Sequence, residues 1–127
     1  MVYSQLCLFN EIDEKQVRSI VIKELKQYRA LKIHLENKKE QKDKGIANLF
    51  PSLRDSSEEA ALKVRQIEKA LYGLLDDSER AIVEKKYLNN NPQNDLVIME
   101  ELCLKKDPYY RKKRYAIQTI ATALAII

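Results

Sequence analysis

The stretch DLVIMEELCLKKDPYYRKKRYAIQTIATAL, residues 95–124, decides the fold, because it predicts two helices joined by a tight turn. The first helix is short and runs from Asp95 to Leu102. The turn is Cys103–Lys106, and the second helix opens at Asp107 and Pro108. Asp107 can accept hydrogen bonds from the free amides of the first turn, and Pro108 suits a first helical position, where no N–H is needed. The apolar positions of the first helix are Leu96, Ile98, Met99 and Leu102.

The second helix combines basic and aromatic side chains. Between Lys105 and Arg114 the chain has six basic residues against one acid, Asp107. A charge run alone is more often a solvated surface, but the preceding turn favours DNA binding. A short helix, a tight turn and a basic second helix form a helix-turn-helix, whose second helix enters the major groove. The inward-packing positions are predicted to be Tyr109, Ala116, Ile117, Ile120 and Leu124.

The predicted DNA-contacting residues lie at the start of this second helix. Residues 107, 110, 111 and 114 follow three- and four-residue steps, which place them on one face. Arg111 is the candidate for a bidentate contact to guanine, with Lys106 and Asp107 at base edges beside it. Tyr110 is expected to stack against a thymine methyl group or a sugar. The predicted phosphate contacts are Lys105, Lys113 and Arg114.

The segment LCLKKDPYYRKKRYAIQTIATAL resembles the C-terminal end of the ArpU-type phage transcriptional regulators, through Tyr109–Arg111, the basic run, Ala116 and the closing Ala-Leu-Ala-Ile. The stretches Leu8–Lys15 and Lys26–Arg29 are similar to the N-terminal part of that family. The resemblance implies a sigma-factor-like helix-turn-helix of the region 4 type. It also implies activation of late phage genes, for packaging and lysis, in contact with host RNA polymerase.

Two residues depart from the family pattern. Lys105 stands where a small polar residue often begins the second helix. Lys112 stands where an apolar residue usually packs inward. The second helix is therefore expected to begin two residues later than in relatives and to pack less tightly along its inward face.

The composition of the 127 residues indicates a globular chain, because 45% are hydrophobic and 33% are charged. Cys7 and Cys103 are expected to be buried thiols in a reducing compartment, and His34 is the single histidine. No pattern of catalytic, cofactor-binding or metal-binding residues is present, so the chain is not expected to be an enzyme. The absence of a signal peptide and of a long apolar run predicts a cytoplasmic protein that does not enter membranes.

The N-terminal region is predicted to contain two long amphipathic helices. The first spans about residues 14–42, with Asp13 as its cap. The second spans about residues 57–75, with Ser56 and Glu59 as a capping box. The two apolar stripes pack against each other as an antiparallel hairpin, or they pair with a second copy of the chain in a homodimer; the sequence leaves both open. The apolar face of the second helix comprises Ala60, Ala61, Val64, Ile67, Leu71, Leu74 and Leu75.

A third helix is predicted to run from Asp76 or Asp77, either of which can be its cap, to about Leu88. The polar stretch of residues 89–94 is a loop. The fold class is therefore all-α, with an N-terminal helical region over 1–75 and a DNA-binding helix-turn-helix domain over 76–127. Inward positions of the third helix are Ile82, Val83 and Tyr87.

Three functions are consistent with these patterns. The first is a sequence-specific DNA-binding transcriptional regulator with double-stranded DNA as its partner. The second is a small terminase-like subunit for DNA packaging, which is disfavoured because such subunits usually carry the DNA-binding unit first. The third is a helical protein-interaction module, which would not need the Asp-Pro helix start. Oligomer size separates the first two, since a ring of many copies would favour the terminase.

Overall fold

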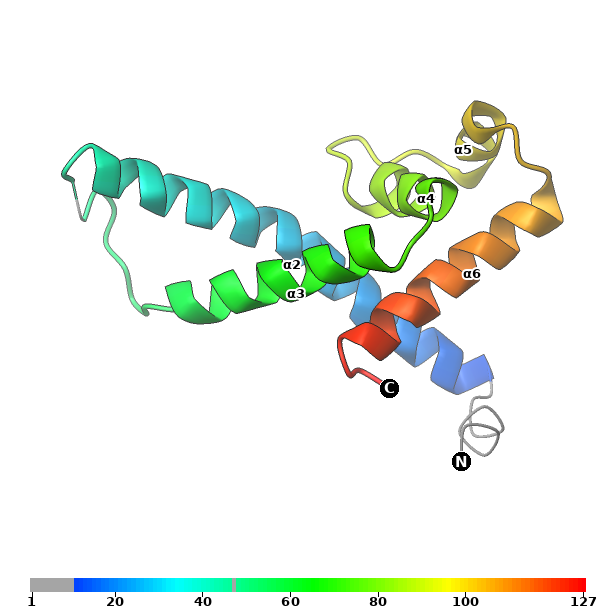
Figure 1. Cartoon of the computed structure of the whole chain (residues 1–127), viewed down its shortest axis with the longest axis horizontal. Helices are drawn as coiled ribbons and strands as arrows, with labels where there is room; N and C mark the ends of the chain where they lie inside the picture. The colour runs from blue at the N-terminus through cyan, green and yellow to red at the C-terminus, as the bar shows by residue number, and fades with distance from the viewer. Residues whose placement is uncertain (1–10, 47) are drawn as a thin grey trace.

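The computed structural model describes residues 11–46 and 48–127, and every regular element in these ranges is an α-helix (Figure 1). The all-α prediction is confirmed for this part of the chain. No helix in it is long and apolar enough to cross a membrane. Cys7 lies outside the described residues. The helices are α2 (Glu11–Asp43), α3 (Ser57–Gly73), α4 (Asp77–Tyr87), α5 (Asp95–Leu102) and α6 (Lys106–Ala123).

Helices α2 and α3 lie side by side as a hairpin (Figure 1). Their apolar stripes meet within one chain, which confirms the first of the two predicted arrangements. At the middle of the pair, the buried Tyr28 hydroxyl donates a hydrogen bond to Oε2 of Glu68 at 2.8 Å. Burial, together with this bond to a carboxylate, raises the pKa of Tyr28 above its ordinary value. The buried positions that pair across the hairpin include Val21, Leu25, Val64, Ile67 and Leu71.

The starts of α2 and α3 differ from the predictions. Helix α2 begins at Glu11, so Asp13 lies inside the helix and is not its cap. Ser56 occupies the cap position of α3, but its side chain accepts no hydrogen bond, since its backbone (φ −124°, ψ 24°) lacks the extended conformation of a capping residue. Oδ1 of Asp55 instead accepts from the Ser57 amide at 3.2 Å. The predicted capping box is therefore wrong, and Glu59 pairs with Arg54 at 3.4 Å.

The end of α3 differs from the prediction, whereas the start of α4 agrees with it. Helix α3 ends at Gly73, so Leu74, predicted on the apolar face, is 56% exposed. Helix α4 has the full capping box that Ser56 lacks. Oδ1 of Asp76 accepts from the Glu79 amide at 2.7 Å, and Oε1 of Glu79 accepts from the Asp76 amide at 2.9 Å. The sequence left Asp76 and Asp77 open as caps, and the structure selects Asp76.

Helix α6 crosses α2 and contacts α3 and α4 as well, so it joins the hairpin to the rest of the fold (Figure 1). Its buried Ala116, Ile117 and Ile120 belong to the same apolar cluster as the α2–α3 pairs. That cluster therefore draws on both predicted regions, 1–75 and 76–127. A second, smaller cluster holds α4, α5 and the start of α6 together. Its buried members are Ile82, Ile98, Met99 and Tyr109.

Candidate nucleic-acid interface

The turn between α5 and α6 has three residues and begins at Cys103. Cys103 adopts a left-handed conformation with φ 54°. Its amide bonds to the Glu100 carbonyl at 3.2 Å, and the Leu104 amide bonds to the Met99 carbonyl at 3.0 Å. These two bonds form a Schellman motif, which satisfies the last carbonyls of α5. At the other end of α5, Oδ1 of Asn94 caps the helix by accepting from the Val97 amide at 2.9 Å.

Helix α6 begins two residues earlier than predicted. Lys105 occupies the cap position, without a side-chain cap bond, and Lys106 is the first helical residue. The prediction that Asp107 caps the helix is therefore wrong. Asp107 lies in the first turn, where its negative charge still favours the helix dipole. Pro108, at the third helical position, costs no hydrogen bond because the first amides of a helix have no intrahelical partner.

Asp95, the first residue of α5, is the hub that holds α6 in place. Its Oδ1 accepts a hydrogen bond from the Tyr109 hydroxyl at 2.6 Å and lies 3.0 Å from Nζ of Lys113. Nζ of Lys86, on α4, lies 3.6 Å from the same oxygen. The Tyr110 hydroxyl reaches Oδ2 at 3.5 Å. One carboxylate therefore ties together α4, α5 and the N-terminal half of α6.

The charges around this hub are mutually stabilising. Burial raises the pKa of Asp95, but hydrogen bonds from Tyr109 and Lys113, with the charges of Lys113 and Lys86, outweigh it, so the pKa falls below its ordinary value. Burial and the Asp95 carboxylate both raise the pKa of Tyr109. Tyr109 is completely buried, as the sequence predicted. Asp95 therefore stays ionised at neutral pH, and Tyr109 stays protonated to donate to it.

The predicted DNA-contacting residues fall into two groups. Four of them are exposed and make no ion pair or hydrogen bond through their side chains within residues 11–46 and 48–127: Lys105, Lys106, Asp107 and Arg111. The other three are engaged. Lys113 is only 15% exposed and bonds to Asp95, whereas Arg114 is 70% exposed with its Nε 3.8 Å from Oε1 of Glu14. Tyr110 is half-exposed, contacting Asp95 and the edge of the Tyr109 ring.

Lys112 occupies a position of α6 where looser packing was predicted, because an apolar residue is usual there. Its side chain is about one-third exposed, and Nζ reaches Oδ2 of Asp76 at 3.3 Å. The aliphatic stem can thus cover the seam while the ammonium group stays near solvent. Asp76 therefore both caps α4 and pairs with α6. Hydrogen bonds from the Glu79 amide, Ser78 and Lys112 lower the pKa of Asp76 against a smaller effect of burial.

Several features were not visible to sequence reasoning. Asp95 was assigned no role, because nothing in the local pattern shows that a residue 14 positions before Tyr109 meets its hydroxyl. Tyr115 and Gln118 are exposed like Arg111 and follow it at helical steps, so they extend the same face of α6. Cys103, predicted to be a buried thiol, is exposed. The prediction that Cys103 is buried is wrong, because this residue ends α5 in a left-handed turn that is exposed to solvent.

The exposed start of α6 is suited to binding an anion. Three cationic side chains, on Lys105, Lys106 and Arg111, surround a helix N-terminus whose free amides carry partial positive charge. Within the described ranges, no three His, Cys, Asp or Glu side chains are grouped as a metal site would require. No protein-family model, curated protein or solved structure matches the chain. What this surface binds is therefore inferred from its charge and geometry.

Proposed function

We propose that this protein is a sequence-specific DNA-binding transcriptional regulator, in which α4, α5 and α6 form a sigma-region-4-like helix-turn-helix. Helix α6 enters the major groove, and α4 supports it. The observation that carries the proposal is the contrast between the two sides of α6. One side is anchored through Tyr109 and Lys113 to Asp95, while the other presents cations that are not paired with carboxylates in the described structure.

This contrast matters because recognition of a base sequence requires a rigid reader. A side chain that reads a base edge must be held to a fraction of an ångström by the residues behind it. Tyr109, buried and hydrogen-bonded at 2.6 Å, fixes the axial position and rotation of α6. Arg111 is two residues further along and points away from this anchor, so its guanidinium group is free to form a bidentate contact with guanine.

The remaining side chains divide between base and phosphate contacts. Lys106 and Asp107 lie beside Arg111 at the entering end and contact neighbouring base edges. Lys105 and Arg114 bind phosphates, which supply most of the affinity but no sequence information. Tyr110 stacks on a thymine methyl group or a sugar. Lys113 acts mainly through Asp95, because its ammonium group is already engaged there.

The proposed biological role follows from the resemblance to the ArpU-type regulators. Such a protein activates phage late genes, for packaging and lysis, and acts with host RNA polymerase. The segment 102–124 carries this resemblance, and its Tyr109–Arg111 triplet coincides with the anchor and the proposed base reader. Both family departures, Lys105 and Lys112, lie at solvent-accessible positions that tolerate a long side chain.

A homodimer through the N-terminal hairpin is part of the proposal, and because the apolar stripes of α2 and α3 pack within one chain, the contact is assigned to the connection between these helices. The connection between α2 and α3 exposes four large apolar side chains at the far end of the hairpin, away from α5 (Figure 1). Clustered apolar exposure of this kind marks contact sites with other proteins. Measurement of molar mass in solution tests it, since a dimer supports a regulator and a large ring supports the terminase alternative. The side chains are Ile46, Leu49, Phe50 and Leu53.

The deciding experiment is selection of genomic DNA fragments by the purified protein, followed by affinity measurements on the selected site. Arg111→Ala is expected to reduce the preference for that site by about 10- to 100-fold, because a bidentate contact is worth about 1–3 kcal/mol of discrimination. Arg65→Ala is the matched control, since Arg65 is an exposed arginine of α3. Unchanged site preference in Arg111→Ala, or no selection of any fragment, would refute the proposal.

A further inference from the structure

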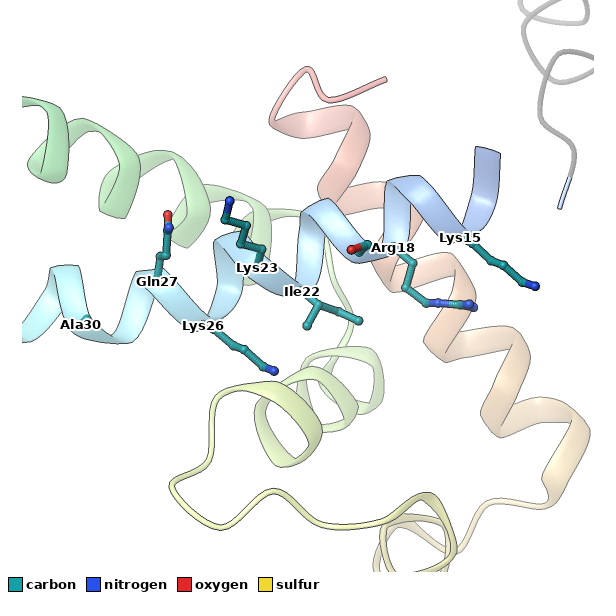
Figure 2. Close-up of a pocket in the computed structure, with 8 residues that line it drawn as sticks. Lys15, Arg18, Ile22, Lys23, Lys26, Gln27 and Ala30 are labelled. Atoms are coloured by element: carbon teal, nitrogen blue, oxygen red, sulfur yellow. The ribbon is translucent and has the colours of Figure 1, made fainter. Parts of the chain in front are cut away.

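Helix α2 carries a basic stripe that the proposed function does not use. Between Lys15 and Lys32 the sequence has six basic residues and one acid, Glu24. Three of the basic residues, Lys15, Arg18 and Lys26, extend from the same side of α2 with Ile22 between them (Figure 2). Lys23 extends from another side of the helix. We name Lys15, Arg18 and Lys26 the α2 basic stripe.

The residues of the stripe have no counter-charge in the part of the chain that the structure describes, unlike the cations at the interface of α2 and α3. On the side facing α3, Lys63 pairs with Glu24 at 3.4 Å and Lys32 pairs with Glu68 at 3.3 Å. The three stripe residues are exposed, and none forms an ion pair or a hydrogen bond with another residue of the described structure. Like charges held on one rigid surface repel one another, so such a surface gains most from a polyanion.

The stripe lies next to the exposed face of α6. Glu14, one residue before Lys15, accepts from Nε2 of Gln118 at 3.3 Å and lies 3.8 Å from Nε of Arg114. Further along, α2 also contacts α4, whose last residue is Tyr87. Burial raises the pKa of Tyr87 there to about 12, Asp95 adds to the rise, and Arg18 opposes it. Helix α2, which carries the stripe, therefore lies against α6 and also contacts α4.

The shape of the site favours a long anion over a small ligand. The described residues that line the depression all belong to α2, so they form an open surface and not an enclosed cavity (Figure 2). Lys15 and Lys26 are separated by about 16 Å along the helix axis, at 1.5 Å per residue. A DNA strand places about five phosphates over that distance, at 3.4 Å each.

A membrane surface would match the charge but not the rest of the helix. Amphipathic helices that bind membranes insert an apolar face beside their basic one. Val21 and Leu25 of the apolar face of α2 are completely buried in the cluster that α2 shares with α3 and α6, and the large apolar side chains exposed elsewhere on the helix are Ile20 and Ile33, at 40% and 54%. Among the described residues, Ile22 is the only large apolar side chain that lines the depression.

We infer that the α2 basic stripe binds backbone phosphates of the same DNA duplex that α6 enters. This inference rests on the proposed function and extends it, because it gives the N-terminal hairpin a direct part in binding. Contacts between the stripe and phosphates increase the affinity for DNA without adding sequence preference, since phosphates are the same at every base pair. The Glu14 contact with Arg114 and Gln118 keeps α2 in position beside α6.

The test uses the full chain and a fluorescently labelled duplex of mixed sequence. Affinity is measured by anisotropy at several salt concentrations for the wild type and three variants. The stripe variant is Lys15→Gln, Arg18→Gln, Lys26→Gln. The control variant removes three exposed lysines from the far end of the hairpin: Lys39→Gln, Lys42→Gln, Lys44→Gln. The α6 variant is Lys105→Gln, Lys106→Gln.

The measured quantity is the slope of log affinity against log salt, which changes by about 0.9 for each phosphate neutralised. We expect the stripe variant to lose about 2 to 3 from the slope, and the control variant to keep the wild-type value. An unchanged slope in the stripe variant, with a reduced slope in the α6 variant, overturns this inference and leaves the proposed function standing. Equal losses in the stripe and control variants also overturn it, because net charge would then explain both.

Two other outcomes are decisive. If the wild type does not bind duplex DNA, the proposed function and this inference fail together. If the stripe variant loses binding to vesicles of anionic phosphatidylserine but keeps its slope on DNA, the stripe is a membrane contact and the inference is overturned. Circular dichroism of each variant confirms that its helical content matches the wild type, so that a changed slope reports binding.

Discussion

Replacing Asp95 by asparagine tests whether this residue is the hub that anchors α6. The substitution keeps the size of the side chain and an acceptor for the Tyr109 hydroxyl. In the wild type this hydroxyl lies 2.6 Å from Oδ1 of Asp95. It removes the negative charge opposite Lys113, at 3.0 Å, and Lys86, at 3.6 Å. The Lys113 side chain is 15% exposed, so water compensates its lost partner only in part.

The expected cost is about 1–3 kcal/mol of unfolding free energy, the range for a charge-assisted hydrogen bond in a partly buried site. For a domain of this size each kcal/mol lowers Tm by about 4 °C. Thermal and urea unfolding, followed by circular dichroism at neutral pH, measure both quantities. The matched control is Asp43→Asn at the exposed end of α2, which is expected to change stability by less than about 0.5 kcal/mol.

The dependence on pH separates loss of charge from loss of packing. The folded pKa of Asp95 lies below the ordinary aspartate value of about 3.9, so ionisation of the carboxyl group stabilises the fold above that pH. That contribution disappears as the pH falls through the folded pKa, because both states are then protonated. The stability difference between wild type and Asp95→Asn should therefore shrink below about pH 4. Equal stability of wild type and Asp95→Asn at neutral pH, or a stability difference that does not change with pH, would refute the role of Asp95 as the hub.

The other predictions concern single contacts. Tyr109→Phe removes the hydroxyl bonded to Asp95 and should lower the unfolding free energy by about 1–2 kcal/mol in urea titrations; an unchanged midpoint would contradict the anchoring role. Asp76→Ala removes the capping box of α4 and should cost about 1–2 kcal/mol, whereas Ser56→Ala should be nearly neutral because its side chain makes no cap bond; equal losses would refute the contrast. Glu14→Gln removes the carboxylate near Arg114, so duplex DNA should bind several-fold more tightly at low salt in anisotropy measurements; unchanged or weaker binding would show that this contact does not restrain the interface.

The helix positions were predictable because their signals are local. Apolar periodicity, the Asp76 capping box and the polar loop at 89–94 act over a few residues, so α4 and α5 appeared close to their observed bounds. The burial of Tyr109 was predictable for the same reason, since it shares a helical face with Ala116 and Ile120. Where a local signal failed, a competing local bond decided the outcome. At the start of α3, Asp55 accepts from the Ser57 amide, Glu59 pairs with Arg54, and Ser56 makes no cap bond.

The candidate site was only partly predictable. Charge placed the interface at the start of α6, because six basic residues within ten positions stand out in any sequence. The sequence could not separate the free cations from the engaged ones. Lys113 and Arg111 look alike in the sequence, yet one is 15% exposed on a carboxylate and the other is exposed without a counter-charge in the described part of the chain.

The sequence by itself determined that this chain is helical, where most of its helices begin and end, and which face of α6 is apolar. Those properties depend on residues within one or two turns of each other. Only the tertiary structure decided that Asp95 meets Tyr109 and Lys113, that α6 crosses α2, and that Glu14 brings the α2 basic stripe beside Arg114. These contacts join residues 14 to 100 positions apart, and their formation depends on how the apolar clusters pack, which no local pattern encodes.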